Sequence, residues 1–308
     1  MKKIFIDGSA GTTGLRIYER IGAREDLEMI VLPDSLRKDP TARKDAINRA
    51  DVAFLCLPDD AARESVSLVE NPSVTVIDTS TAHRTLPDWA YGFPELSKKH
   101  EEKILSSKRI AVPGCHASGF IALVYPLIEA GVLDKDELLS CYSLTGYSGG
   151  GKKMIAEYED KNRNPLLSAP RHYALAQQHK HLKEMQAITG IANAPAFCPI
   201  VADFYSGMLV SVPLFKNQCK ATIEEVKEIY KNKYQGEIVQ YKESFDESGF
   251  VSALSLSGKD GMQVTVTGNS DRMVLMAVYD NLGKGASGAA VECMNLALGT
   301  DRTKGLVL

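Results

Sequence analysis

The chain has 308 residues, 44% of them hydrophobic, which is enough to bury a sizeable core and to form two domains. Lys and Arg (36) nearly balance Asp and Glu (39), so no global basic field exists to hold nucleic acid or an anionic membrane surface. No apolar run approaches a membrane span, and residues 3–6 indicate a strand rather than a signal peptide. We therefore expect a cytoplasmic protein that acts on a small molecule.

The first part of the chain alternates short apolar strands with helical stretches. A helical stretch at residues 15–21 follows the first strand, and the strand-like runs are residues 4–6, 29–32, 52–57, 74–77 and 110–112. Strands that are apolar on both faces are typical of a parallel sheet covered by helices on both sides. An α/β fold with a Rossmann-like, doubly wound parallel sheet is therefore predicted.

A glycine-rich loop joins the first strand to the first helix. Glycines let the backbone turn tightly and approach a pyrophosphate, whose charge is then met by amide groups at the helix N-terminus. The loop is predicted to bind a dinucleotide through Gly8, Ser9, Ala10, Gly11, Thr12, Thr13 and Gly14.

The end of the second strand is where a ribose contact is expected. Arg37 and Lys38 there would hold a 2′-phosphate, whereas Asp34 would serve the 2′-hydroxyl of NAD. The basic pair favours NADP(H) as the cofactor.

Cys115 stands out among six scattered cysteines, which show neither a disulfide framework nor metal-ligand spacing. It lies just beyond a strand, at the start of a helix predicted over residues 117–130. A helix N-terminus favours the thiolate, which is the nucleophile, and its amides can receive an oxyanion. Cys115 is therefore the candidate nucleophile, and no metal site is expected.

Two further segments suit an acidic substrate. Ser148, Gly149 and Lys152 belong to a second glycine-rich loop that carries hydroxyl and ammonium groups. Arg84 follows a strand and could clamp a carboxylate or a phosphate. Together with a nucleotide loop and a thiol, they indicate acyl phosphate chemistry.

A nucleophile also needs an acid or base, and His179 and His181 are the candidates. On a continuous helix, His181 would share a face with Glu184, and His179 would lie on the neighbouring face. Only one histidine is therefore expected to point into the site.

The second part of the chain has a different texture. A helix is predicted at residues 223–233, with strands at 209–213, 251–256 and 262–267; the last two would pair across a turn at 257–261. A helical period over residues 285–298 could return to the first domain. We expect residues 1–115 with a C-terminal helix, residues 286–308, to bind NADP, and residues 116–285 to form an α+β domain for catalysis and oligomerisation.

Five motifs, in order over nearly the whole chain, resemble the short form of the N-acetyl-γ-glutamyl-phosphate reductase family. They are Gly8 to Gly14, Pro113-Gly114-Cys115, Tyr147 to Lys152, His179-Lys180-His181 and Asp280 to Ala290. The segment after the cysteine differs from the longer form, with His116-Ala117-Ser118 in place of an aromatic residue, Pro and Thr.

The resemblance implies NADPH-dependent reduction of N-acetyl-γ-glutamyl phosphate to the semialdehyde in arginine biosynthesis, through a thioester on Cys115. It implies His179 as acid/base, with His181 the alternative and Glu184 a possible orienting residue. It also places Asn281, Lys284 and Gly285 near the nicotinamide. The acetyl specificity rests on the resemblance alone.

Two alternatives remain at this stage. Aspartate-semialdehyde dehydrogenase uses similar chemistry on a shorter amino acid, and a non-catalytic NADP sensor would use the same loop with Cys115 as a structural thiol. A homodimer or homotetramer is expected, because antiparallel strands in the second domain could pair across a symmetric interface.

Overall fold

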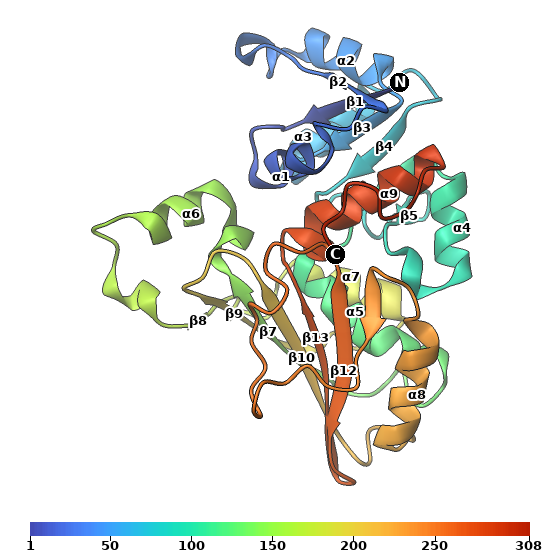
Figure 1. Cartoon of the computed structure of the whole chain (residues 1–308), viewed down its shortest axis with the longest axis vertical. Coiled ribbons are helices and arrows are strands. Elements are labelled where there is room, and N and C mark those ends of the chain that lie inside the picture. Colours follow the sequence, from blue (N-terminus) through green and yellow to red (C-terminus); the bar gives the residue numbers. More distant parts are fainter. The chain divides into compact units, whose positions relative to one another are not determined.

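The computed structural model describes residues 1–308, and the chain divides into two compact units (Figure 1). Unit 1 comprises Met1–Gly114 and Ala286–Leu306, and unit 2 comprises Cys115–Gly285 and Val307–Leu308. None of the helices combines the length and apolar character that a membrane crossing needs.

Unit 1 is built on a six-stranded, fully parallel sheet in the order β2-β1-β3-β4-β6-β5. This is the predicted alternating arrangement of strands and helices. Its elements are β1 (Lys2–Asp7), α1 (Thr12–Ile21), β2 (Leu27–Ile30), α2 (Pro40–Arg49), β3 (Val52–Leu55), α3 (Asp59–Ser67), β4 (Thr75–Asp78), β5 (Ala90–Tyr91), α4 (Lys98–Ser106), β6 (Arg109–Ala111) and α9 (Gly288–Leu298).

Alternate side chains along the central strands of unit 1 enter two separate cores. On β1, Ile4 and Ile6 pack with residues of α1 and α9 on one face of the sheet. Phe5 packs with Ala46 and Ile47 of α2 on the other face. Since strand side chains alternate between faces, apolar runs such as Ile4-Phe5-Ile6 require helices on both sides. The doubly wound arrangement follows from this pattern.

Unit 2 holds a mixed seven-stranded sheet in the order β11-β12-β13-β10-β7-β9-β8. Most neighbouring strands are antiparallel, but β7 with β9 and β11 with β12 run parallel. Its elements are α5 (Cys115–Glu129), β7 (Ser140–Gly146), α6 (Gly151–Glu159), β8 (Arg171–His172), α7 (His181–Thr189), β9 (Ala196–Ala202), β10 (Met208–Phe215), α8 (Ile223–Lys233), β11 (Val239–Tyr241), β12 (Met262–Gly268) and β13 (Arg272–Tyr279).

The strand predicted at residues 251–256 is wrong. This segment forms successive turns, in which the Ser252 hydroxyl accepts from the Leu254 amide and the Ser255 hydroxyl donates to the Ser252 carbonyl. Such local serine bonds compete with a strand ladder. The antiparallel partner of β12 is instead β13, the next strand along the chain.

Candidate active site

The glycine loop of unit 1 has the tight geometry of a phosphate cradle. Gly8 has φ +86°, and its carbonyl accepts from the Gly11 amide at 2.9 Å before α1 begins at Thr12. A Cβ on Gly8 would lie 2.3 Å from the Cys56 carbonyl oxygen, and one on Gly14 would lie 2.5 Å from the Gly8 carbonyl oxygen. The first turn of α1 carries no acidic side chain, so its amides suit an anion. These residues fit a dinucleotide pyrophosphate.

Gly8→Ala is expected to lower the free energy of unfolding by about 2 kcal/mol or more, because alanine strains a positive φ and its methyl group meets backbone. Thermal unfolding with and without NADP⁺ checks this, and the rise in melting temperature expected on adding NADP⁺ should be smaller for the variant than for the unchanged protein. Gly131→Ala is the matched control, with φ +70° and open space around the added Cβ. Equal effects of the two substitutions would contradict a tight cradle at Gly8.

The residues proposed for the ribose contact lie just after β2. The guanidinium of Arg37 pairs with the Asp34 carboxylate at 2.7 Å, and both side chains are exposed. Lys38 is also exposed. Arg37, which favours NADP, is thus paired with Asp34, which would serve NAD. A 2′-phosphate would compete with the Asp34 carboxylate for the Arg37 guanidinium.

Arg84 lies in the loop that follows the carboxyl end of β4, and it bonds two backbone carbonyls. Its Nε donates to the Val112 carbonyl at 2.8 Å, and a terminal nitrogen donates to the Thr79 carbonyl at 2.9 Å. Nearby, Asp78 lies 2.6 Å from His83 Nδ1, and the His83 ring stacks on Trp89 with centroids 4.1 Å apart. Sequence reasoning missed the Asp78–His83 pair, which fixes the loop that carries Arg84.

Cys115 is the first residue of α5, and its side chain is half-buried. The Tyr279 hydroxyl donates to the Cys115 carbonyl at 2.5 Å and accepts from the Gly119 amide at 3.1 Å, so it lies within the first turn of the helix. A Cβ on Gly119 would lie 2.7 Å from that hydroxyl, and one on Gly285 would lie 3.0 Å from the Cys115 Cβ. The hydroxyl of Tyr279 therefore holds the backbone at Cys115, the candidate nucleophile, and Gly119 and Gly285 leave space around it, which sequence reasoning had not predicted.

Tyr279→Phe is expected to reduce kcat about 10-fold, because the Cys115 carbonyl loses its donor while the fully buried ring is retained. Steady-state kinetics and the alkylation rate of Cys115 by iodoacetamide check this together. Tyr230→Phe is the control, since its buried hydroxyl donates to the Leu123 carbonyl in the same helix, away from its first turn. Equal kcat for both variants would contradict a positioning role for Tyr279.

Three histidine rings meet beside the start of α5, although His179 and His181 were expected on neighbouring faces of one helix. His179 and His181 have ring centroids 4.6 Å apart, and each lies 5.6 Å from the His116 ring. The assumption of one continuous helix was wrong, because α7 begins at His181 and His179 lies on the preceding turn. The Nδ1 of His179 accepts from the His181 amide at 3.2 Å. Glu184, in the first turn of α7, is buried.

Burial lowers the pKa of His116 to about 3, and the charge of His179 contributes to the shift. An unfolded histidine, with its pKa of about 6.5, binds a proton that the folded one does not. The free energy of unfolding therefore keeps this contribution in full above pH 6.5. It falls by up to roughly 4–5 kcal/mol as the pH drops from 6.5 toward 3. Urea unfolding at pH 7 and pH 4 gives the free energy of unfolding at each pH. Its decrease from pH 7 to pH 4 should be smaller for His116→Gln than for the unchanged protein. An identical loss would contradict the buried neutral imidazole.

The structure brings Asn281 together with the second glycine-rich loop. Its Nδ2 donates to Ser148 Oγ at 2.9 Å, and its Oδ1 accepts from the Gly207 amide at 2.9 Å. A Cβ on Gly149 would lie 3.5 Å from that same Nδ2. Lys152, in the first turn of α6, is exposed, whereas Lys284 is almost fully buried.

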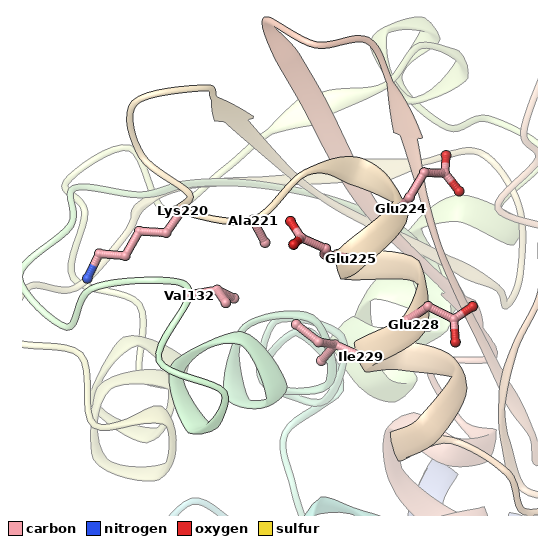
Figure 2. Close-up of a pocket in the computed structure, with 7 residues that line it drawn as sticks. All are labelled: Val132, Lys220, Ala221, Glu224, Glu225, Glu228 and Ile229. Carbon is pink, nitrogen blue, oxygen red and sulfur yellow. The ribbon is translucent and has the colours of Figure 1, made fainter.

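A surface pocket of about 400 Å³ in unit 2 contains none of the predicted site residues (Figure 2). Several of its polar side chains serve local structure, since Lys220 pairs with Asp134 and Glu225 forms a capping box with Thr222. Its lining is Val132, Lys220, Ala221, Glu224, Glu225, Glu228 and Ile229. No group of three His, Cys, Asp or Glu side chains suits a metal ion.

Two family models cover most of the chain. "Semialdehyde dehydrogenase, NAD binding domain" matches residues 9–104, and "Semialdehyde dehydrogenase, dimerisation domain" matches residues 115–281. The N-acetyl-gamma-glutamyl-phosphate reductases of Brucella ovis and Brucella canis are each 46% identical over 306 residues, covering 96% of this chain and 99% of theirs. The chain belongs to the N-acetyl-γ-glutamyl-phosphate reductase family. The resemblance noted from the motifs is confirmed.

Solved structures show that the family's fold is shared with aspartate-semialdehyde dehydrogenases. The Vibrio cholerae enzyme II complexed with ASA has a TM-score of 0.73 at 17% identity, covering 97% of this chain and 98% of that one. The Candida albicans enzyme with NADP has a TM-score of 0.66 at 17% identity, covering 97% and 99%. This likeness confirms the predicted α/β fold, and the family model over residues 9–104 supplies its NAD(P)-binding domain.

Proposed function

We propose that the chain reduces N-acetyl-γ-glutamyl phosphate to N-acetylglutamate γ-semialdehyde and phosphate, with NADPH as the donor. The observation that carries this proposal is identity of 46% to named reductases over 96% of the chain. The site chemistry supports it, because Cys115 begins a helix and two histidines cluster in the same unit. Reduction of an acyl phosphate through a thioester uses a nucleophile for the acyl group and an acid/base for the oxygen of the tetrahedral intermediate.

The glycine loop Gly8 to Gly14 would hold the pyrophosphate of the cofactor, and Arg37 and Lys38 would hold the 2′-phosphate that distinguishes NADP from NAD. When bound, NADPH supplies the hydride that reduces the acyl carbon.

Cys115 is proposed to attack the acyl carbon of the substrate as the thiolate. The new C–S bond forms as the bond from the acyl carbon to the phosphate oxygen breaks, and phosphate leaves. Amides in the first turn of α5 would face the developing oxyanion, and the positive end of the helix dipole favours its charge. Splitting the reaction in this way helps because a thioester accepts hydride more readily than a carboxylate does.

His179 is proposed to supply the proton that the reduced tetrahedral oxygen takes up, with His181 as the alternative. As the thiohemiacetal collapses, the same histidine takes this proton back from the oxygen, the C–S bond breaks, the thiolate returns and the aldehyde is freed. Because Nδ1 of His179 accepts from the His181 amide, the exchanging proton is assigned to Nε2.

A reverse-direction assay tests the proposed function. Purified protein would be mixed with N-acetylglutamate semialdehyde, phosphate and NADP⁺, and NADPH formation followed. Aspartate semialdehyde and NAD⁺ serve as the competing substrate and cofactor. The proposal predicts turnover that needs phosphate and prefers the acetylated aldehyde and NADP⁺. Preference for aspartate semialdehyde would contradict the substrate, and NADP⁺ binding without turnover on either aldehyde would indicate a sensor.

The chain is proposed to form a homodimer or homotetramer through the sheet of unit 2. Helices α5 and α8 pack on one face of this sheet. The opposite face leaves Tyr142 and Phe215 half or more exposed, along with partly exposed Leu209 and Met276. Exposed apolar side chains on one face of a sheet favour an interface between chains, and the matching family model is described as a dimerisation domain. Light scattering should give at least twice the chain mass, and Tyr142→Asp with Phe215→Asp should lower it; a monomer would contradict this proposal.

A further inference from the structure

His116 follows the nucleophile directly, yet the proposed mechanism gives it no task. It is 3% exposed, and both ring nitrogens have partners: Nδ1 lies 2.6 Å from Ser143 Oγ, and Nε2 lies 2.5 Å from Tyr173 Oη. Because His116 is the second residue of α5, the helical turn that carries Cys115 also sets the place of this imidazole. An imidazole with both nitrogens bonded is fixed in rotation as well as in position.

The side chains around His116 determine the protonation state of its imidazole. The titratable side chains around it are Cys115, which precedes it, and Tyr173, His179 and His181, which contact its ring. Burial and the nearby His179 lower the pKa of His116 to about 3, so the ring stays neutral at working pH. A neutral imidazole has one donor and one acceptor, which the two hydroxyls match, since each can donate or accept. His116 therefore does not act as the acid/base, and the proton in the reaction is exchanged by His179 or His181.

Tyr173 connects His116 to a short loop that leads to His179. Its backbone amide donates to the Pro199 carbonyl of β9, and its hydroxyl meets His116. Burial raises the pKa of Tyr173, and so does the charge of Cys115, so the phenol remains protonated. The residue therefore serves as a hydrogen-bonding partner and carries no charge of its own beside the thiol.

The loop between Tyr173 and His179 is held in an unusual conformation. Ala174 and Gln177 have positive φ angles of 53° and 55°, which non-glycine residues rarely adopt. The Gln177 side chain bonds both backbone groups of Phe197, donating to the carbonyl at 2.7 Å and accepting from the amide at 2.8 Å. The Phe197 ring in turn meets His116 and His179, with centroids 5.4 and 5.2 Å apart. Such strain persists only where the surroundings over-determine the conformation.

We propose that His116 is a positioning residue, which ties the first turn of α5, carrying Cys115, to the loop that carries His179, through the hydroxyl of Tyr173. His116 contacts both ends of this loop, by a hydrogen bond at Tyr173 and by ring contact at His179. The link fixes the separation between nucleophile and proton donor before substrate binds. The inference rests on the proposed function, because it assigns the two groups their tasks.

The test compares Tyr173→Phe, which removes the hydroxyl and keeps the ring, with His116→Phe, which keeps a ring and removes both bonds. Each is expected to lower kcat by about 10- to 100-fold with little change in KM, because a small misplacement of reacting groups acts on the chemical step. The double variant should be no slower than the slower single variant, since both break one link. His116→Gln, which retains one hydrogen bond, should recover part of the rate.

Matched controls and a second readout separate this link from general damage. Tyr241→Phe removes a phenol bonded to Glu243, and His172→Gln replaces an exposed histidine; both should leave kcat unchanged. The pH profile of Cys115 alkylation by iodoacetamide needs no substrate, and Tyr173→Phe and His116→Phe should shift it equally. If the two variants shift the alkylation profile equally but the unchanged protein shows no turnover, the proposed function fails and the link stands.

Three outcomes would overturn the inference. One is a His116→Phe or Tyr173→Phe variant with kcat within 2-fold of the unchanged protein. Another is a double variant whose losses multiply, since independent residues would then be responsible. The third is a loss of kcat that follows the fall in thermal stability while the alkylation profile stays the same, which would make His116 merely structural.

Discussion

Cys115→Ser is expected to lower kcat by about 1,000-fold or more while NADP⁺ still binds. Serine keeps the approximate size of the side chain but is a far weaker nucleophile at neutral pH, so the thioester intermediate does not form. The glycine loop that is proposed to hold the cofactor belongs to unit 1, and Cys115 belongs to unit 2. The reverse assay and an NADP⁺ fluorescence titration measure the two properties separately.

Cys198→Ser is the matched control, because Cys198 is also partly exposed but lies within β9, away from any helix N-terminus. Its kcat should stay within about 2-fold of the unchanged protein. Turnover by Cys115→Ser at more than a tenth of the original rate would rule out a thioester on this residue.

His179→Asn is expected to lower kcat by about 100- to 10,000-fold, the usual range for loss of a general acid or base. Asparagine can still accept the His181 amide where Nδ1 did, so α7 should keep its start. What it lacks is the Nε2 proton. The pH dependence of kcat should lose one ionisation, and the melting temperature should change little.

His181→Asn distinguishes the two candidate histidines. His181 is 5% exposed in the first turn of α7, so this change should cost more stability and less rate than His179→Asn. If His181→Asn proves the slower enzyme at equal stability, then His181 is the acid/base and His179 serves only to accept the His181 amide.

Much of the fold could be predicted from local patterns. Apolar strands such as Ile4-Phe5-Ile6, followed by glycines and a helix, specify a buried parallel strand and its phosphate turn without help from distant residues. The same holds for Cys115, whose place between a strand and a helix is visible in the sequence. The segment at residues 251–256 was wrong because serine hydroxyls replaced the strand ladder there.

The surroundings of Cys115, the proposed nucleophile, could not be predicted in this way. Tyr279 reaches Cys115 across 164 positions, and Tyr173 reaches His116 across 57. These contacts depend on the order of strands in unit 2, which local periodicity does not specify. The only signal for the histidine cluster in the sequence was the short spacing of His179 and His181. A continuous helix through both was assumed, and it would have placed their rings on different faces.

The most direct test of the covalent route is a burst experiment without phosphate. The protein, N-acetylglutamate semialdehyde and NADP⁺ are mixed, NADPH is followed in a stopped-flow instrument, and the quenched protein is weighed by mass spectrometry. Oxidation of the thiohemiacetal to a thioester predicts one NADPH per chain and an added acyl group on the Cys115 peptide, released when phosphate is supplied. Steady NADPH formation without phosphate, or a burst that leaves Cys115 unmodified, would contradict a thioester on this residue.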